Sequence, residues 1–190
     1  MSNLVLIIGP SGVGKGTMLK MFQNKHSEFF FPISVTTRPP RETEKNGETY
    51  YFVSKQEFLQ KIKNKEFLEY ACVHHLHYYG TLKQDILQAL TNGKNVIREI
   101  DYQGFLAIKK IINPQQLKTI FLLPPSLECL QKRIQSRSKI KTNELEQRMN
   151  SLKKEIKIAK KCTKTIKLID GDIKKSYEIF EKIVLSLIKQ

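Results

Sequence analysis

The sequence lacks the features of a membrane protein or of a disulfide-stabilised protein. No apolar run approaches the roughly 20 residues that a transmembrane helix needs. The N-terminus leads directly into a short apolar segment, which leaves no room for a signal peptide. The cysteines are odd in number and include no CxxC pair, so neither a disulfide framework nor a zinc site is predicted. We therefore expect a cytoplasmic protein without a membrane partner.

Acidic residues and arginine are both scarce beside lysine. The 190 residues include 33 basic and 18 acidic side chains, a formal net charge of +15, and 27 of the basic ones are lysine. Residues 132–175 alone hold 15 basic and five acidic side chains. Such a surface suits nucleic acid or a pocket for several nucleotide phosphates. For Lys153–Lys167 we favour a third interpretation, a solvated lysine-rich helix face.

The few arginines are more informative than the many lysines. A chain that uses lysine elsewhere is expected to keep arginine where a planar, bidentate fork is needed. Five of the six lie in segments with other signs of phosphate binding. The six are Arg38, Arg41, Arg98, Arg133, Arg137 and Arg148.

The most informative segment is GPSGVGKGT at residues 9–17, which directly follows an apolar run at residues 4–8. A strand that leads through a glycine-rich turn into a helix is typical of a phosphate-binding loop, because glycine lets several backbone N–H groups approach an anion. We expect Lys15 to reach the outer phosphates of a nucleoside triphosphate. The predicted triphosphate-binding residues are Gly9, Pro10, Ser11, Gly12, Val13, Gly14, Lys15, Gly16 and Thr17.

Two features bear on magnesium. The usual loop pattern has Ser or Thr after the lysine, where its hydroxyl touches the metal, but this chain has Gly16, so Thr17 or water must serve. Glu99 and Asp101 end a predicted central strand, and residues two apart share a face there, so both carboxylates are expected at the ligand-binding edge of the sheet. Thr17 and Asp101 are thus the magnesium candidates, through water; the alternative for Asp101 is a capping acid before a helix at Gln103.

Strand-like and helix-like segments alternate, which predicts an α/β fold around a mostly parallel sheet. Core strands are predicted at Leu4–Ile8, Phe31–Val35, Asn95–Ile100, Leu117–Leu122 and Thr165–Ile169. Helices are predicted at Lys15–Asn24, Ser126–Gln135, Asn143–Lys161 and Ile173–Lys189. We expect one domain, 1–190, whose core comprises residues 1–33, 83–135 and 147–190. A mixed lobe with a short helix near Ser54–Lys63 is inserted at about 34–82, and a polar lid lies at about 136–146.

The inserted lobe carries a second set of polar candidates. In TTRPPR, residues 36–41, two prolines hold the chain extended, so Arg38 and Arg41 point the same way as a clamp for one phosphate group; an ordinary exposed loop is the alternative. A carboxylate at Glu69 would accept hydrogens from N1 and N2 of guanine, an edge that adenine lacks, with Ser34 or Thr81 at O6. Tyr50 and Tyr79 are candidates for a phosphate oxygen, although each residue alone is more often an ordinary side chain.

The remaining arginines follow a predicted strand. Arg133 and Arg137 are four apart and share a helix face, and Arg148 lies beyond the predicted lid. These cations are expected on a transferring phosphoryl group, because phosphoryl transfer depends on positioning and charge neutralisation more than on a strong base.

Taken together, these residues resemble the guanylate kinases, a family of P-loop nucleoside monophosphate kinases. The likeness covers nearly the whole chain. Its six motifs, in order, are GPSGVGKGT (9–17), SVTTRPPR (34–41), GETYYF (47–52), YYGT (78–81), EIDYQG (99–104) and PPS (124–126). Two segments depart from the family pattern: the histidine-rich loop at 74–80 is one residue longer, and Asp170-Gly-Asp172 stands where the family often has Asn-Asp-Asp with an adenine-binding asparagine.

The resemblance implies a core, a GMP-binding lobe and a lid, and the reaction ATP + GMP = ADP + GDP with magnesium, in a monomer or homo-oligomer. It implies GMP contacts from Ser34, Arg38, Arg41, Tyr50, Glu69, Tyr79, Thr81 and Glu99. It implies catalytic roles for Lys15, Arg38, Arg133, Arg137 and Arg148. The rival is a non-catalytic guanylate-kinase-like module that binds phosphorylated proteins; such modules tend to lose the phosphate loop, which is intact here. Nucleic-acid binding, which rests on net charge alone, is weaker still.

Overall fold

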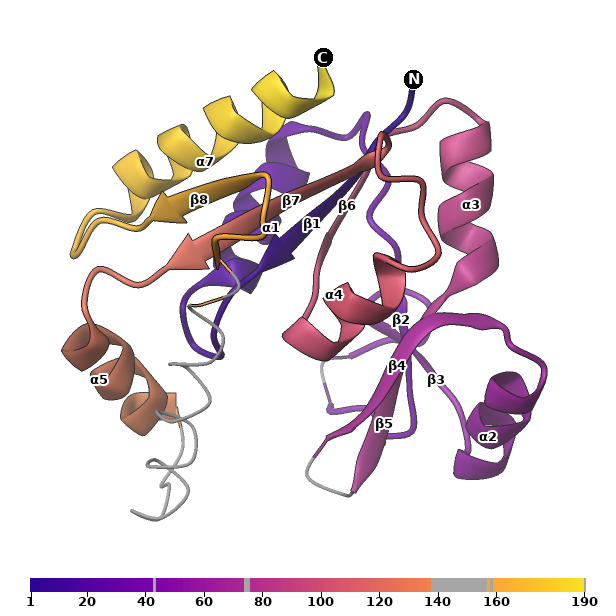
Figure 1. The fold of residues 1–190 in the computed structure, drawn as a ribbon. Coiled ribbons are helices and arrows are strands. Elements are labelled where there is room, and N and C mark those ends of the chain that lie inside the picture. The colour runs from indigo at the N-terminus through magenta and orange to yellow at the C-terminus, as the bar shows by residue number, and fades with distance from the viewer. Residues whose placement is uncertain (43, 74–75, 138–156, 158, 190) are drawn as a thin grey trace.

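The computed structural model describes residues 1–42, 44–73, 76–137, 157 and 159–189. These residues form two separate four-stranded sheets, which we call the core sheet and the lobe sheet (Figure 1). The core sheet is parallel, in the order β6 (Val96–Glu99), β1 (Leu4–Ile8), β7 (Leu117–Leu123), β8 (Lys164–Lys167). The lobe sheet is mixed, in the order β3 (Tyr50–Phe52), β2 (Ser34–Thr36), β5 (His77–Leu82), β4 (Phe67–Val73). The predicted α/β fold, with a parallel core and a mixed second sheet, is confirmed.

Helices flank both sheets. They are α1 (Lys15–Lys25), α2 (Lys55–Lys63), α3 (Lys83–Thr91), α4 (Tyr102–Ile108), α5 (Leu127–Arg137) and α7 (Ile173–Ile188). The predictions for α1, α5, α7 and the short helix α2 are confirmed to within two residues, and so are those for β1, β6, β7 and β8. The predicted helix Asn143–Lys161 and the predicted lid lie almost wholly outside the described residues.

Strand β1 shows how the core is built. All five of its residues are at most 1% exposed. Val5 and Ile7 point into an apolar cluster with α1 and α7, whereas Leu4, Leu6 and Ile8 point into a second cluster with α3 and α4. This alternation follows from the two-residue period of a strand. The core sheet is therefore covered on both faces, as is usual for parallel sheets.

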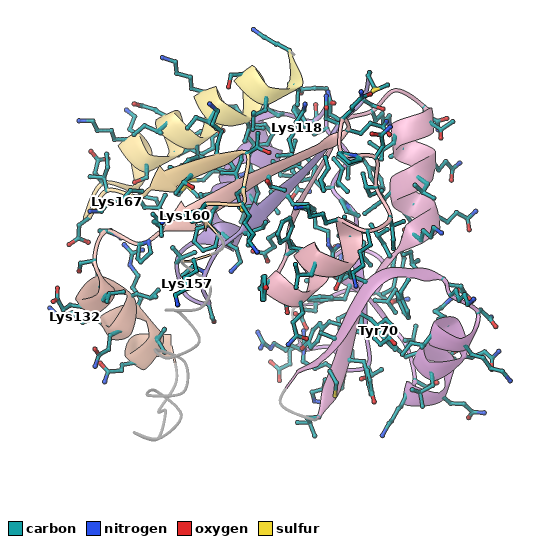
Figure 2. All side chains as sticks on the ribbon, in the orientation of Figure 1. Tyr70, Lys118, Lys132, Lys157, Lys160 and Lys167 are labelled. Carbon is teal, nitrogen blue, oxygen red and sulfur yellow. The ribbon has the colours of Figure 1, made fainter. Side chains whose placement is uncertain are left out.

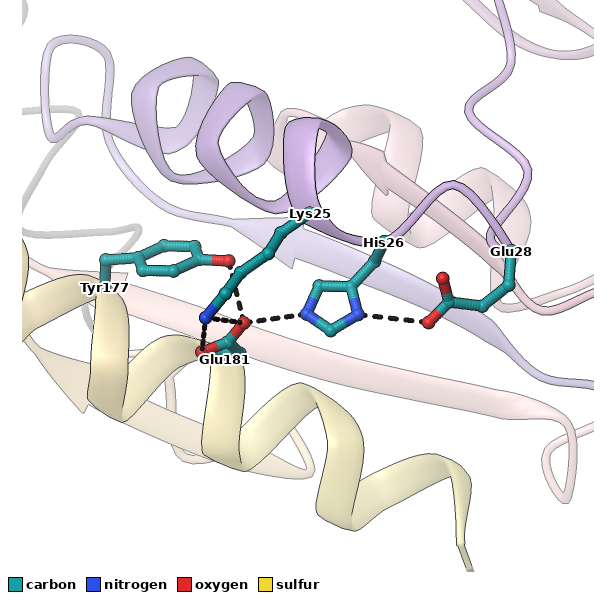
Figure 3. A network of polar contacts seen from close by, with 5 residues as sticks. All are labelled: Lys25, His26, Glu28, Tyr177 and Glu181. Carbon is teal, nitrogen blue, oxygen red and sulfur yellow. Dashed lines mark hydrogen bonds and ion pairs between the residues drawn. The ribbon is translucent and has the colours of Figure 1, made fainter.

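Helices α1 and α7 are joined by both apolar and polar contacts. The rings of Phe22 and Phe180 meet edge to face at 5.9 Å. Beside them, Glu181 of α7 contacts Lys25 and the His26 ring, and the Tyr177 hydroxyl donates to the same carboxylate (Figure 3). This polar network lies where α1 ends.

One predicted core strand is wrong. Residues 31–33 are not in a strand; Phe30 alone bridges to Val96 at the outer edge of β6, and the chain then enters the lobe sheet as β2. The physical reason is Pro32, which has no backbone N–H to donate to a ladder. The apolar run that resembled one strand therefore divides between the two sheets.

Four lysines of the second half of the chain illustrate its basic surface. Lys132, Lys157, Lys160 and Lys167, which are labelled in Figure 2, are all exposed. This agrees with a solvated face for the described part of Lys153–Lys167. In the part of the chain that the structure describes, no helix is long and apolar enough to cross a membrane.

Candidate active site

The glycine-rich loop that is predicted to bind phosphate lies between β1 and α1, where the sequence places it. Gly14 precedes the helix with φ of 116°, a backbone conformation that favours glycine. At Gly9, an added Cβ would lie 2.7 Å from the Leu122 carbonyl oxygen of β7, so only glycine fits there. The Lys15 ammonium donates to the carbonyls of Gly9 (2.7 Å) and Pro10 (3.1 Å), so it lies over the loop.

A cavity of about 340 Å³ opens beside this loop. Gly12, Gly14 and Thr17 line one side of it, and Arg133 of α5 lines another. The rest of the wall comes from the segment between β8 and α7 and the start of α7, namely Leu168, Ile169, Gly171, Asp172, Ile173 and Ser176, with Val13 and Met18 from the loop and α1. The cavity is thus lined both by groups that are candidates for phosphate binding and by apolar side chains.

Arg133 is the predicted lid-side cation that the structure brings to the loop. Its Nη1 donates to the Val13 carbonyl at 3.3 Å, and its Nη2 lies 4.0 Å from Asp170 Oδ1. Asp170, where the family often has asparagine, accepts from the Cys129 thiol at 2.8 Å, and this contact raises the pKa of that thiol. Arg137 ends α5, but its side chain and all of Arg148 lie outside the described part of the chain.

Four predicted GMP ligands form one row across the lobe sheet. Tyr50 of β3 pairs with Ser34 of β2, Ser34 with Thr81 of β5, and Thr81 with Glu69 of β4. Directly paired residues have neighbouring side chains on one face. The register therefore assembles, from four separate chain segments, a polar row that ends in a carboxylate.

Glu69 owes its position to a β-bulge. The pairing of β4 with β5 shifts register between Phe67 and Glu69, and bulges of this kind re-aim a side chain. Leu68 at the bulge is buried in the apolar cluster around α3 and α4, which attaches the lobe to the core. Glu69 is 9% exposed and accepts a short hydrogen bond from the Thr81 hydroxyl. Burial raises the pKa of the Glu69 carboxyl.

The arginine clamp includes an acid that sequence reasoning missed. Arg38 Nη2 donates to both Glu44 oxygens, at 2.8 and 2.9 Å, and the Arg41 backbone N–H donates to the same carboxylate at 2.8 Å. The Arg38 guanidinium also lies 5.5 Å from the Tyr50 ring centre, and that ring is 5.9 Å from the ring of Tyr79. The Arg41 side chain is exposed. The signal available in the sequence was Glu44 itself, an acidic residue six positions after Arg38.

The two acids at the end of β6 have different surroundings. The Glu99 carboxylate is exposed and lies against Gly16, where a Cβ would be 3.5 Å from Glu99 Oε2. Asp101 instead caps α4, its Oδ1 accepting from the Gly104 N–H at 2.8 Å, so the capping alternative is confirmed. The prediction of a central strand is wrong, because β6 is at the edge of the core sheet that the described residues form.

Comparison with known proteins gives one consistent result. The family model described as guanylate kinase matches residues 1–187. The guanylate kinase of Clostridium tetani is 47% identical over 158 residues, which are 83% of this chain and 74% of that protein. That of Thermosynechococcus vestitus is 39% identical over 183 residues, 96% of this chain and 93% of the relative.

A solved structure shares the fold. The crystal structure of guanylate kinase from Anaplasma phagocytophilum matches with a TM-score of 0.73 at 24% identity, over all of this chain and 87% of that one. Together with the family match along almost the entire sequence, these findings establish that this chain belongs to the guanylate kinase family.

Proposed function

We propose that the protein is an ATP-dependent kinase that transfers the terminal phosphoryl group of ATP to GMP, giving ADP and GDP. The observation that carries this proposal is the polar row that ends in buried Glu69, on a sheet separate from the phosphate-binding loop. The chain thus has one region suited to a triphosphate and another suited to a purine base. The family match supports the same reaction.

On the acceptor side, the row supplies the groups that guanine requires. An ionised Glu69 accepts hydrogens from guanine N1 and N2, and the hydroxyls of Ser34 and Thr81 are the candidates near O6. Adenine presents neither hydrogen to Glu69, so its binding would leave the second oxygen of a buried carboxylate without a donor, which is costly. Arg38, Arg41, Tyr50 and Tyr79 are proposed to hold the phosphate, since the Arg38 guanidinium already lies beside the Tyr50 ring.

On the donor side, the backbone of residues 9–17 and the Lys15 ammonium are proposed to hold the ATP phosphates. Arg133, Arg137 and Arg148 are proposed to neutralise charge on the transferring group, and Arg133 already contacts the loop at Val13. The cavity beside Thr17 and Ile169 is suited to the nucleoside. Transfer would be direct, because phosphoryl transfer needs positioned cations rather than a covalent intermediate.

The residues beside Gly16 fit a magnesium ion. Carboxylate and hydroxyl oxygens are its preferred protein ligands. The exposed Glu99 carboxylate lies over Gly16, which has no side chain to occupy the space in front of it. Asp101 keeps its Oδ2 for a bound water after capping α4 through Oδ1. We propose Thr17, Asp101 and Glu99 as the groups around the metal. When bound, magnesium would neutralise the phosphate oxygens and hold them in line.

The test is the release of ADP from ATP and magnesium with GMP, AMP, CMP and UMP as separate acceptors. We expect turnover with GMP, and AMP at least about 100-fold less efficient. The Lys15→Ala variant serves as the inactive control. Equal turnover with all four acceptors would contradict the base-reading row. GMP binding without any turnover would reject the kinase and favour a binding module.

A further inference from the structure

Arg98 lies between the core and the polar row, and it is the arginine outside the phosphate-directed segments. It belongs to β6, and its side chain is only 11% exposed. Its Nη2 donates to the Ser34 hydroxyl at 3.2 Å and lies 3.4 Å from Glu69 Oε1. Its Nη1 approaches the Pro32 carbonyl at 3.5 Å, and its Nε is buried without a hydrogen-bond partner among the described residues.

An arginine is unexpected at this place. Val96 and Ile100, two residues before and after it on the same face, are 0% and 6% exposed and belong to the apolar cluster around α3 and α4. Burial of a guanidinium costs free energy, and here it lowers the pKa of Arg98. An apolar side chain would fit the stripe at lower cost. The position therefore requires a reason other than packing.

Its partners supply that reason. Ser34 and Glu69 are on β2 and β4, which are not adjacent, because β5 with Thr81 lies between them. Arg98 contacts both, and Glu69 Oε1 is thus close to two donors, the Thr81 hydroxyl and the Arg98 guanidinium. Glu69 Oε2 packs against Gly104 of α4, where an added Cβ would be 3.1 Å away. One carboxylate oxygen is thus anchored, and the orientation of the other is fixed.

Arg98 also affects the ionisation of Glu69. Burial raises the pKa of Glu69 most strongly, Arg98 and the Thr81 hydroxyl lower it, and Asp101 raises it further. The acids Glu69 and Glu99 and the Tyr50 hydroxyl face the guanidinium of Arg98 in turn. Arg98 is thus the cation that opposes the effect of burial on Glu69. Without it, the carboxyl would hold its proton to higher pH.

We propose that Arg98 is a positioning residue for guanine selection, an inference that rests on the proposed function. Arg98 holds Ser34 and the negatively charged Glu69 in the arrangement that recognises the base. It acts through these two residues. Selection of the acceptor base is thereby tied to a side chain from core strand β6.

The test measures binding of GMP and of IMP, which lacks the N2 amino group, by calorimetry without ATP between pH 5.5 and 7.5. The ratio of the two dissociation constants reports the N2 contact, and phosphate ionisation cancels because both ligands share it. We expect Arg98→Met to lower the GMP preference by about tenfold at pH 5.5 and by less as the pH rises, because a higher pH favours the ionised Glu69 carboxylate. Arg98→Lys should stay close to the parent, since it keeps the charge.

Two controls separate this role from a structural one. Val96→Ala removes buried contacts from the same face of β6, so it should lower the melting temperature without changing the GMP:IMP ratio at any pH. In a Glu69→Gln background, Arg98→Met should change the ratio by less than about twofold, because residues that act together are not additive. If Arg98→Met does not fold, the neutral Arg98→Gln beside Arg98→Lys makes the same comparison.

The proposal is overturned if the neutral variants keep the parent ratio at pH 5.5, or if they lose it equally at every pH and additively with Glu69→Gln. Neither outcome bears on the kinase reaction, which is tested by ADP release from the parent protein. Conversely, a parent protein that binds GMP selectively but does not turn over would remove the proposed reaction while leaving the role of Arg98 open to this measurement.

Discussion

Core strand β1 and the lobe sheet differ in where they hold their polar groups. Core strand β1 is entirely apolar and buried, and its functional groups come from the loop that follows it. The lobe sheet keeps its functional groups within the strands, and Thr36 and Thr81 are fully buried with their hydroxyls bonded. The core therefore presents backbone N–H groups and a lysine, which suit phosphates of any nucleotide. The lobe presents side chains in register, which suit one base.

This contrast predicts that changes in the two regions have separable effects. Damage to the loop should reduce the chemical step and leave acceptor binding intact. Damage to the row should change which base is accepted. Sites that are far apart and share no partners are expected to behave independently.

The largest effect is expected from Lys15→Ala in the core. Removal of the ammonium that lies over the loop should lower kcat by at least about 10³-fold, because it leaves the phosphates without a positioned cation. Calorimetry should show GMP affinity unchanged within about twofold. Lys20→Ala, an exposed lysine of the same helix, is the matched control and should retain full turnover. A Lys15→Ala variant that turns over normally would contradict the role of the loop.

The next effect is expected from Arg38→Ala in the lobe. The guanidinium is 15% exposed and bonded to Glu44, so its loss should lower kcat/KM for GMP by about 10²-fold. ATP binding, measured with a nonhydrolysable analogue, should not change. Arg38→Lys keeps the charge but not the planar fork, and should recover only part of the activity. Equal loss of ATP and GMP binding would indicate damage to both regions and contradict a separate role for the lobe.

The contrast also explains what the sequence could predict. The continuous apolar run of β1 and the glycines at 9, 12 and 14 are local signals, so the core strand, the loop and the start of α1 were predictable. The row was predictable residue by residue but not as a row, because it depends on pairing among four segments and on a bulge at Leu68. Pro32 and Arg98 show the same limit, since the role of Arg98 depends on partners that are distant in the sequence and the effect of Pro32 depends on which sheet the segment joins.

A third, smaller effect separates base reading from phosphate binding within the lobe. Glu69→Gln replaces an acceptor oxygen by an amide that presents hydrogens, so kcat/KM for GMP should fall by about 10- to 100-fold. The KM for ATP should stay unchanged, and AMP should remain a poor acceptor. Glu66→Gln, which removes a surface carboxylate paired with Lys61 just before β4, is the control and should have no effect on either nucleotide. Loss of activity with both variants would refute a specific role for Glu69.

The smallest effect is expected away from both sites, at the polar network between α1 and α7. Glu181 is 15% exposed, and its contact with the His26 ring, at 2.7 Å, is the main cause that lowers the pKa of its carboxyl below 4.5. A lowered carboxyl pKa stabilises the fold fully above about pH 4.5, and this stability is lost as the pH falls through the folded-state value. Glu181→Gln should therefore reduce the free energy of unfolding by about 1 kcal/mol at pH 7, or roughly 2–4 °C in melting temperature, and by almost nothing near pH 3. Thermal unfolding followed by circular dichroism across this range measures the difference.

Glu178→Gln, which changes an exposed acid on the same helix, should leave the melting temperature unchanged. A loss that persists undiminished at pH 3 would mean that packing, rather than the ionised carboxylate, joins the two helices.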